Sequence, residues 1–264
     1  MQLGLKGKTA FVTGSTAGIG YASALGLARE GVSVVVNGRT KARVAEAVAK
    51  IKQDTGNEQV SGVAADLGTA DGCEEALRQI PSVDILVNSL GIFEPKDFGE
   101  ITDADWFKFF ETNVLSGVRL SRHYFPLMKV KNWGRIVFVS SESAVNIPAE
   151  MIHYGMTKTA QLAVARGLAE LTVGTGVTVN SVLPGPTKSE GVGTFIAQMA
   201  KTHGGDEKAV EEEFFKSVRP SSLLHRFETP DEVAAMITFV CSAAASGVNG
   251  AALRVEGGVV RSIV

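Results

Sequence analysis

Short runs of β-branched and other apolar residues recur along the chain, and segments of helical periodicity, such as 21–30 and 41–53, separate them. Strands that alternate with helices pair in parallel, because each helix carries the chain back to the same edge of the sheet. The runs are apolar almost throughout, which indicates a sheet covered on both faces. The sequence therefore predicts an α/β fold, a doubly wound parallel sheet of about seven strands with helices on both faces. The predicted strands are TAFVT at 9–13, VSVVVN at 32–37, VSGVAAD at 60–66, VDILVN at 83–88, RIVFVS at 135–140, VTVNSVL at 177–183 and AALRVE at 251–256.

The composition allows one large hydrophobic core and argues against several kinds of partner. Of the 264 residues 45% are hydrophobic, and the net charge is -2 with both signs mixed along the chain. This balance gives no electrostatic reason to bind nucleic acid or an anionic membrane. Cys73 and Cys241 lie far apart, with no CxxC and no nearby histidine cluster, which indicates neither a disulfide framework nor a metal site. Because we find no apolar signal segment and no run of about 18 apolar residues, we expect a cytoplasmic protein.

No repeat, low-complexity tract or linker divides the chain, so we expect a single domain over residues 1–264. One connection, between the sixth and seventh predicted strands, is much longer than the others. A long connection in a compact domain usually carries a function. We therefore expect a substrate lid at about 187–228, with an oligomer contact as the alternative.

A glycine-rich loop, TGSTAGIG at 13–20, follows the first predicted strand and opens a helix. Glycines let the backbone turn sharply and approach a pyrophosphate, whose charge the helix N-terminus stabilises. The spacing GxxxGxG differs from the more familiar GxGxxG, but the strand before the loop and the helix after it favour a dinucleotide site. The expected cofactor contacts in this loop are Gly14, Ser15, Thr16, Gly18, Ile19 and Gly20.

The end of the second predicted strand, VNGRT at 36–40, bears on the choice of cofactor. In such folds a carboxylate at this point binds the ribose 2′-hydroxyl of NAD and repels a 2′-phosphate. No carboxylate is present here, and Arg39 can pair with a phosphate through its planar fork of donors. We therefore expect a preference for NADP(H). NAD(H) remains possible, because the glycine loop carries no basic residue and Asn37 could hydrogen-bond an unphosphorylated ribose.

Seven motifs in order resemble the classical short-chain dehydrogenase/reductase family over essentially the whole chain. The resemblance implies a Rossmann-like sheet, a nicotinamide cofactor and hydride transfer between that cofactor and a carbonyl or secondary alcohol. It also implies that residues 1–90 mainly bind the dinucleotide and that residues 91–264 carry catalysis. The motifs are TGSTAGIG at 13–20, Asp66, NSLG at 88–91, Asn113 in ETNVLSG, SS at 140–141, Tyr154-x-x-x-Lys158 and PGPT at 184–187.

The resemblance assigns a catalytic set of Asn113, Ser141, Tyr154 and Lys158. Tyr154 would be the general acid in reduction and the general base in oxidation. A phenol is a poor base at neutral pH, so Lys158, one helical turn away, would favour the phenolate. Ser141 would hydrogen-bond the substrate oxygen, with Ser140 as the competing candidate. Asn113 would lie in a helix that bends locally to hold a water, completing a proton relay to Lys158.

Other positions resemble the family's cofactor contacts. Asp66 and Leu67 match the pair that flanks the adenine, and Thr187 matches the threonine that meets the nicotinamide carboxamide. One motif departs from the family, because the usual NNAG reads NSLG and places Leu90 where a small residue is expected. The expected cofactor contacts outside the glycine loop are Asn37, Arg39, Asp66, Leu67, Asn88, Gly91, Tyr154, Lys158, Pro184, Gly185 and Thr187.

The sequence constrains the substrate less than the chemistry. An apolar lid favours a hydrophobic or medium-sized ketone or alcohol over a free sugar. The runner-up is a β-ketoacyl thioester on acyl carrier protein, as in 3-oxoacyl-acyl-carrier-protein reductases. The candidate pocket residues, with the hydrophobic core as the alternative, are Phe93, Ile147, Met151, Phe195, Met199 and Phe214. The candidate basic rim for the acidic carrier, with a solvated helix face as the alternative, is Arg119, Arg122, Lys129 and Lys131.

Two further interpretations concern residues around the site and the assembly. His153 neighbours Tyr154 but points to another side of the helix, so we interpret it as structural. The C-terminal tail GGVVRSIV at 257–264 is apolar for an exposed end, which, with the family's habit, predicts a homotetramer or a dimer. A nucleotide-binding protein without chemistry is a less favoured alternative to an enzyme, and an extended-class epimerase or dehydratase is the least favoured.

Overall fold

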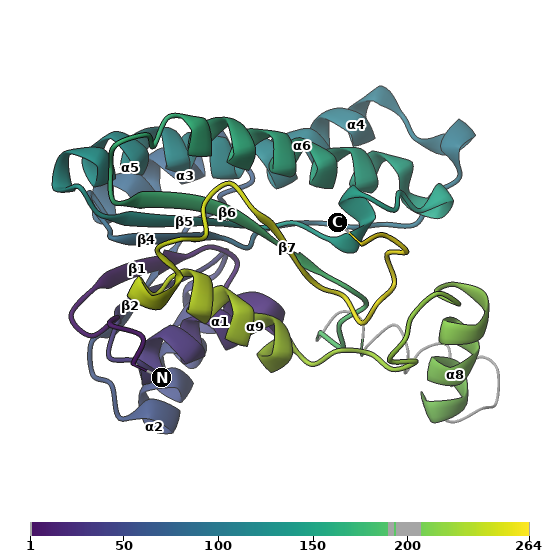
Figure 1. Cartoon of the computed structure of the whole chain (residues 1–264), viewed down its shortest axis with the longest axis horizontal. Helices are drawn as coiled ribbons and strands as arrows, with labels where there is room; N and C mark the ends of the chain where they lie inside the picture. The colour runs from purple at the N-terminus through teal and green to yellow at the C-terminus, as the bar shows by residue number, and fades with distance from the viewer. Residues whose placement is uncertain (1, 190–192, 194–206, 264) are drawn as a thin grey trace.

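Seven strands form one sheet in the computed structural model, which describes residues 2–189, 193 and 207–263 (Figure 1). The strand order is β3-β2-β1-β4-β5-β6-β7, and all the pairings are parallel. The predicted doubly wound parallel sheet is therefore confirmed. The strands are β1 Thr9–Val12, β2 Ser33–Gly38, β3 Val60–Ala64, β4 Ile85–Asn88, β5 Gly134–Val139, β6 Val177–Pro184 and β7 Ala252–Val255.

Helices cover both faces of the sheet (Figure 1). On one face Leu27, Ile51 and Ile237 pack with strand residues in one buried cluster. On the other face Leu120 and Ile136 belong to a second cluster. These two cores explain why the strands carry apolar residues on both sides. The first layer is α1 Gly18–Arg29, α2 Lys41–Thr55 and α9 Pro230–Val240, and the second is α3 Ala70–Gln79, α5 Ser116–Lys131 and α6 Ile152–Glu170.

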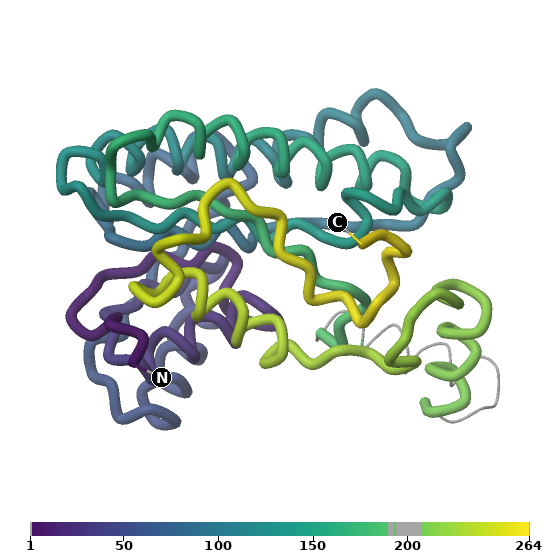
Figure 2. Tube along the Cα trace, in the orientation of Figure 1, coloured from purple at the N-terminus to yellow at the C-terminus, as the bar shows by residue number. Residues whose placement is uncertain are grey.

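Helices α1 and α9 are far apart in sequence but lie side by side (Figure 2). A Cβ atom at Gly26 would lie 2.7 Å from Oγ1 of Thr238, so the bare backbone of α1 is what permits this close approach. Glycine weakens a helix interior, and here the packing against α9 offsets that cost. The contact fixes the C-terminal part of the chain against the helix that follows the glycine loop.

The strand order reverses between β1 and β4, which are neighbours in the sheet although β2 and β3 come between them in the chain. The chain leaves β1 into α1 on one face, whereas the chain that leaves β4 returns through helices of the other face. The two connections therefore diverge at the carboxyl ends of these strands. Doubly wound sheets bind ligands in the crevice that such a divergence opens.

A π-helical turn joins two helices on the second face. It spans Glu111–Leu115, between α4 (Asp103–Phe110) and α5, and the N–H of Ser116 bonds to the carbonyl of Glu111. The additional residue in such a turn breaks the regular helical register. Asn113, at its centre, is buried. The structure thus has a local irregularity where the family resemblance predicts a bend.

The described part of the predicted lid carries α8 (Glu207–Ser217), which lies apart from the two helical layers (Figure 1). Phe215 and Phe227 form a small core of their own with Phe214 packed against them. Residues 190–192 and 194–206 of the predicted lid lie outside the described residues. Within the described ranges, no helix is both long enough and apolar enough to cross a membrane. The remaining short helices are η1 Phe98–Glu100, η3 Glu142–Ala144, η4 Ala149–Met151 and η5 Ala243–Ala245.

Candidate active site

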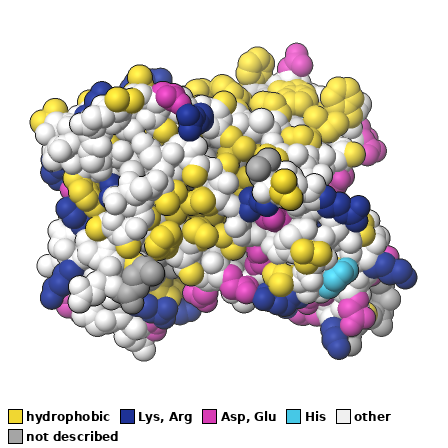
Figure 3. Space-filling model, viewed as in Figure 1, with side chains coloured by type: hydrophobic (Ala, Val, Ile, Leu, Met, Phe, Trp, Pro, Cys, Tyr) yellow, Lys and Arg dark blue, Asp and Glu magenta, His cyan; other side chains and the backbone are white. Residues whose placement is uncertain are grey.

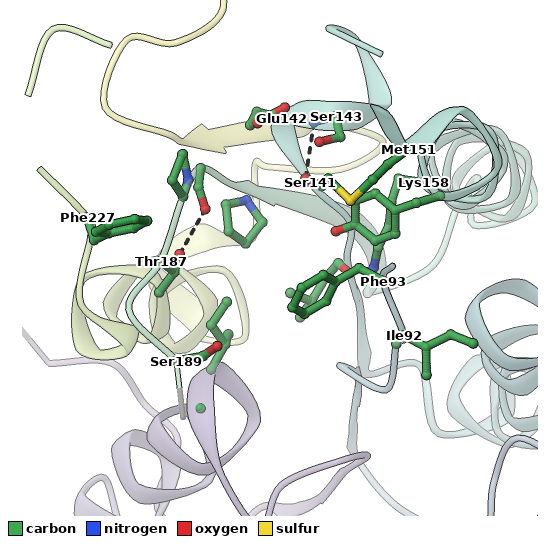
Figure 4. A pocket seen from close by; sticks show the side chains of 18 of the residues that line it. Ile92, Phe93, Ser141, Glu142, Ser143, Met151, Lys158, Thr187, Ser189 and Phe227 are labelled. Atoms are coloured by element: carbon green, nitrogen blue, oxygen red, sulfur yellow. Dashed lines mark hydrogen bonds between the residues drawn. The ribbon is translucent and has the colours of Figure 1, made fainter. Parts of the chain in front are cut away.

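A cavity of about 970 Å³ lies at the carboxyl ends of the strands (Figure 4). Its walls come from the segments after β1, β4, β5 and β6 and from α8. In Figure 4, Ser141, Met151 and Phe93 lie on one side of the cavity and Thr187 and Phe227 on the other. The predicted residues that line the cavity are Gly14, Thr16, Gly18, Ile19, Gly20, Gly91, Ser141, Tyr154, Lys158, Pro184, Gly185 and Thr187. The predicted residues that do not line it are Ser15, Asn37, Arg39, Asp66, Leu67, Asn88 and Asn113.

The glycine loop has a backbone that side chains would disturb. Gly14 and Gly18 have φ angles of 59° and 57°, a region that favours glycine. A Cβ atom at Gly20 would lie 2.4 Å from the carbonyl oxygen of Gly14. Ala17, the N-cap of α1, makes no side-chain hydrogen bond to the helix, which leaves N–H groups of the first turn available to an anion. The loop therefore fits the pyrophosphate of a dinucleotide.

Two predicted cofactor contacts support this loop from behind. The side-chain oxygen of Asn37 accepts a bond from the N–H of Gly14 at 3.1 Å, and its amide nitrogen donates to the carbonyls of Val63 and Ala65. Ser15 Oγ accepts from the N–H of Asn37 at 2.9 Å. Because the Asn37 amide is occupied by backbone groups at both ends, we correct its expected role from ribose contact to support of the loop.

Basic residues follow β2, where a carboxylate would otherwise select NAD. Arg39 is exposed and does not line the cavity, whereas Arg43, which the sequence interpretation missed, does line it. After β3, Asp66 is exposed and its Oδ1 accepts a bond from the N–H of Gly68, whereas Leu67 is buried. Arg43 therefore brings one guanidinium group to the cavity, and Arg39 and Asp66 follow the neighbouring strands β2 and β3.

The expected acid and its lysine lie together on α6. Lys158 Nζ is 5.6 Å from the ring centroid of Tyr154, and both residues line the cavity. Lys158 is buried and donates a hydrogen bond to the carbonyl of Val139, at the end of β5. Ser140 donates to the carbonyl of Lys158 at 2.9 Å, so its hydroxyl is engaged with α6. Ser141 lines the cavity together with Tyr154 and lowers the pKa of its phenol, which favours Ser141 over Ser140 as the group that meets the substrate oxygen.

Burial moves the pKa values of both residues. It raises the pKa of Tyr154 to about 12, while the side chain of Ser141 acts in the opposite direction. It lowers the pKa of Lys158 to about 8. At neutral pH the phenol therefore holds its proton, and the lysine is charged but close to its titration range. A protonated phenol is the form that reduction of a carbonyl requires.

The side chain of Asn113 is occupied by the protein. Its Oδ1 accepts from the N–H of Ile92 at 2.8 Å, and its Nδ2 donates to the carbonyl of Ile92 and to Oγ1 of Thr157, both at 3.0 Å. Its backbone carbonyl accepts a hydrogen bond from Gln161, and Gln161 also accepts one from Lys158. Sequence reasoning missed Gln161, although a glutamine in the mainly apolar segment that follows Lys158 is a visible signal.

The leucine in the NSLG motif, which differs from the family's usual NNAG, does not fill the cavity. Leu90 is partly buried and packs against the second core cluster, and its N–H donates to Oγ1 of Thr13 at 3.0 Å. Ser89 and Gly91, on either side of it, line the cavity. Asn88 is buried, with its Nδ2 near Oγ of Ser121 at 3.4 Å. Leucine is accommodated because its side chain turns toward the core.

The family model for short chain dehydrogenases matches residues 8–200. The chain belongs to the short-chain dehydrogenase/reductase family. It is thus an NAD(P)-dependent oxidoreductase that transfers hydride between a nicotinamide cofactor and a carbonyl or secondary alcohol, and the confirmed family agrees with the prediction made from the motifs.

Relatives and solved structures match this short-chain dehydrogenase over its whole length. It is 47% identical over 263 residues to the protein called uncharacterized oxidoreductase YvaG of Bacillus subtilis, with 100% of both chains covered. It is 31% identical over 264 residues to the 3-oxoacyl-acyl-carrier-protein reductase FabG of Aquifex aeolicus, covering 98% of this chain and 100% of that one. The crystal structure of L-sorbose reductase from Gluconobacter frateurii complexed with NADPH and L-sorbose matches with a TM-score of 0.92 and 32% identity, covering 100% of both chains.

The short-chain dehydrogenase has an ion-pair cluster in the cavity wall that sequence reasoning missed. Arg219 is buried and pairs with Glu142 at 3.0 Å and with Glu150 at 3.2 Å. Burial raises the pKa of Glu142, and Arg219 opposes this rise. Glu142 directly follows Ser141, whereas Arg219 comes from the far end of the predicted lid. The contact is not visible in the sequence because the partners are separated by 69 and 77 positions.

The segment after β6 is held by a buried carboxylate. Glu228 Oε2 accepts a hydrogen bond from the N–H of Gly185 at 3.2 Å, and its backbone pairs with Thr187. Burial raises the pKa of Glu228 to about 7. Thr187 Oγ1 donates to the carbonyl of Gly185 at 2.9 Å (Figure 4). Pro184, Gly185 and Thr187 thus form a wall whose shape depends on Glu228.

The substrate end of the cavity is mainly apolar. Of the predicted pocket residues, Phe93, Met151 and Phe214 line it and Ile147 does not; Phe195 and Met199 lie outside the described residues. The rings of Phe93 and Tyr154 meet edge to face at 6.3 Å between centroids. The cavity wall therefore places an aromatic ring beside the expected acid.

His153 lies in the protein interior, as its interpretation as a structural residue implied. It is buried between α6 and α4, with its ring centroid 4.0 Å from that of Phe109 and 6.0 Å from that of Trp106. It does not line the cavity. Among the residues that the structure describes, no group of histidine, cysteine or acidic side chains is arranged to hold a metal ion.

Replacement of Gly20 by alanine should weaken NADPH binding. The new methyl group would collide with the Gly14 carbonyl and displace the loop, so we expect the dissociation constant to rise about tenfold or more. Fluorescence titration with NADPH measures this change. Gly167→Ala is the matched control, because Gly167 is an exposed residue of α6 and a Cβ there would meet nothing within 4 Å. Equal NADPH affinity in Gly20→Ala and the wild type would contradict the proposed loop contact.

Proposed function

We propose that this short-chain dehydrogenase is an NADP(H)-preferring enzyme that interconverts a ketone and a secondary alcohol, with substrates of medium size and mostly apolar character. The observation that carries the proposal is that Ser141, Tyr154 and Lys158 line one cavity together with the open glycine loop. The intact catalytic set also argues against a nucleotide-binding protein without chemistry.

The residues of the chain would hold the dinucleotide along the cavity. The backbone N–H groups between Gly14 and Gly20 would bind the pyrophosphate. Asp66 and Leu67 would flank the adenine, and Thr187 would meet the nicotinamide carboxamide. When bound, the cofactor supplies or accepts the hydride. The proposed walls around it are completed by Thr16, Ile19, Gly91, Pro184 and Gly185, which line the cavity, and Ser15 and Asn88 would support these walls as buried residues.

Proton transfer would be the task of Tyr154. In reduction it gives its phenolic proton to the carbonyl oxygen, and Ser141 hydrogen-bonds the same oxygen as negative charge builds there. In oxidation Tyr154 takes the proton of the alcohol, and the positive charge of Lys158 favours the phenolate that this requires. The Lys158 ammonium would also bind the nicotinamide ribose. Asn113 would act through the backbone around it, since its side chain holds Ile92 and Thr157.

The preference for NADP(H) rests on charge at the end of β2. Arg39 is exposed there, Arg43 lines the cavity, and the segment from Asn37 to Thr40 has no carboxylate to repel a phosphate. The related L-sorbose reductase was solved with NADPH. Use of NAD(H) as a second cofactor is compatible with the same site.

The apolar substrate proposal rests on the apolar side chains that line the cavity, among them Phe93, whose ring meets that of Tyr154. Phe93, Met151 and Phe214 offer surface to a hydrophobic or medium-sized ketone or alcohol. A polyhydroxy ketone is the second candidate, because charged Glu142, Glu150 and Arg219 also reach the cavity and hydroxyl groups can pair with such side chains. The L-sorbose reductase structure contains a substrate of that second class.

An acyl-carrier-protein substrate is suggested by the FabG relative and by a similar solved structure described as a putative betaketoacyl-ACP reductase. The proposed basic rim is partly neutralised, because Arg119 pairs with Glu111 and Lys131 pairs with Asp84. The rim lies on α5, and none of Arg119, Arg122, Lys129 and Lys131 lines the cavity. We therefore rank this substrate below the two free ketones.

We also propose a cytoplasmic homo-oligomer, a tetramer or a dimer. Apolar side chains are spread over the face shown in Figure 3. Leu223 and Ile263, near the C-terminal segment, are 81% and 99% exposed, and exposed apolar groups of this size are typical of interfaces. Sedimentation velocity of the purified chain measures the assembly, and a monomer at all concentrations would rule it out.

Tyr154→Phe should abolish turnover while leaving the nucleotide site intact. Loss of the proton donor should lower kcat by about 100-fold or more, with NADPH affinity nearly unchanged. Absorbance of NADPH with a panel of apolar ketones and polyhydroxy ketones measures turnover and ranks the two substrate classes. Tyr21→Phe is the control, because the Tyr21 hydroxyl has no hydrogen-bond partner among the described residues and is not in the cavity. Wild-type turnover in Tyr154→Phe would refute the assignment.

Arg39→Ala should reduce the discrimination between the two nucleotides. Loss of a charge-assisted bond to the 2′-phosphate should weaken NADPH binding about tenfold and leave NADH binding unchanged. Isothermal titration with each nucleotide measures the ratio. Arg29→Ala is the control. It removes an exposed arginine from the C-terminal end of α1, away from the glycine loop, and should change neither affinity. An equal loss for NADH and NADPH would show that Arg39 does not read the phosphate.

A further inference from the structure

Gln161 connects the two parts of the predicted proton relay directly. It lies on α6 one turn beyond Lys158, and it is buried, with 1% of its surface exposed. Its Nε2 donates to the backbone carbonyl of Asn113 at 2.5 Å, and its Oε1 accepts from Nζ of Lys158 at 3.3 Å. One amide group therefore bridges the π-helical turn and the buried ammonium.

Only one of the two orientations of the Gln161 side-chain amide makes both hydrogen bonds. The Asn113 carbonyl can only accept a hydrogen bond, and the Lys158 ammonium can only donate. A flipped amide would place its nitrogen against the ammonium and its oxygen against the carbonyl, losing both bonds. Gln161 is thus fixed by its two neighbours, and it fixes them in turn.

Lys158 is held from two directions and left free in a third. The carbonyl of Val139 accepts at 3.0 Å and Gln161 accepts at 3.3 Å, while the ammonium has three N–H donors. A Cβ atom at Gly91 would lie 3.3 Å from Nζ, so the glycine keeps this side of the ammonium clear. One donor therefore remains for the cavity that Lys158 lines.

We propose that Gln161 is a positioning residue of the hydride-transfer site, which takes the place of the relay water between Asn113 and Lys158 and orients the ammonium toward the cavity. The inference rests on the proposed function, because it concerns the lysine assigned to tune Tyr154. A carboxamide does not release or take up protons near neutral pH. The bridge therefore holds Lys158 in place without conducting protons past Asn113, and the proton that Tyr154 gives up is restored from the cavity side.

The charge of Lys158 depends on this acceptor. Tyr154 is the titratable group beside Lys158 on α6. Among the described residues, burial is the cause that lowers the pKa of Lys158. Val139 and Asn113, on the elements packed against it, contribute uncharged carbonyl and amide groups. A hydrogen bond accepted by Gln161 favours the charged amine and opposes the effect of burial.

Methionine and glutamate are similar in size to glutamine, and they change the hydrogen-bond acceptor of Lys158 in opposite ways. Gln161→Met removes it and should lower the pH at which Lys158 titrates by about one unit from its value of about 8. Gln161→Glu introduces a carboxylate and should raise that pH. Nuclear magnetic resonance of isotope-labelled lysine follows the titration, and the signal is assigned by its loss in Lys158→Arg. Thr172→Val is the control, because it removes a different buried hydrogen-bonded group, remote from the cavity.

The enzymatic counterpart is the alkaline limb of the pH profile of kcat/KM for ketone reduction. It should move to lower pH in Gln161→Met and to higher pH in Gln161→Glu, with Thr172→Val unchanged. Unshifted titration of Lys158 in both folded Gln161 variants would overturn the inference. The resonance measurement needs no turnover, so absence of any ketone reduction by the wild type would reject the proposed function alone.

Discussion

A buried ammonium organises the catalytic half of this protein. Lys158 is taken out of water, which is costly for a charge, and it is compensated by the carbonyl at the end of β5 and by the amide of Gln161. Three separate elements must therefore meet at one point. The hydrogen bonds around the Lys158 ammonium connect the end of β5, the π-helical turn and α6. Tyr154 lies one turn before Lys158 on α6.

The fold could be predicted from the sequence because its signals are local. Apolar runs such as 135–140 and the glycine loop at 13–20 carry their structural meaning within a few residues, and the strands and the first helix were found where they were expected. The spacing of Tyr154 and Lys158 also carries over directly, since helical geometry fixes the relation of residues four apart.

Features that depend on tertiary contacts could not be predicted in this way. Asn37 was expected to face a ribose, but the groups that occupy its amide come from β3 and from the glycine loop. Leu90 was expected beside the cofactor, but the direction of its side chain is decided by an available core. Gln161 was visible as a polar residue, yet its partner Asn113 is 48 positions away. Pairings of this kind are decided by the assembled fold.

The ion pair between Arg219 and Glu142 bears on how such enzymes diversify. Arg219 belongs to the segment that shapes the substrate end of the cavity, and its charge also lowers the pKa of Tyr154, whereas Glu142 raises it. A lid transplanted from a relative would bring its own residue to this position. The segment that selects the substrate therefore also affects the pKa of Tyr154. Replacing it to change the substrate would also change the pH dependence of the reaction.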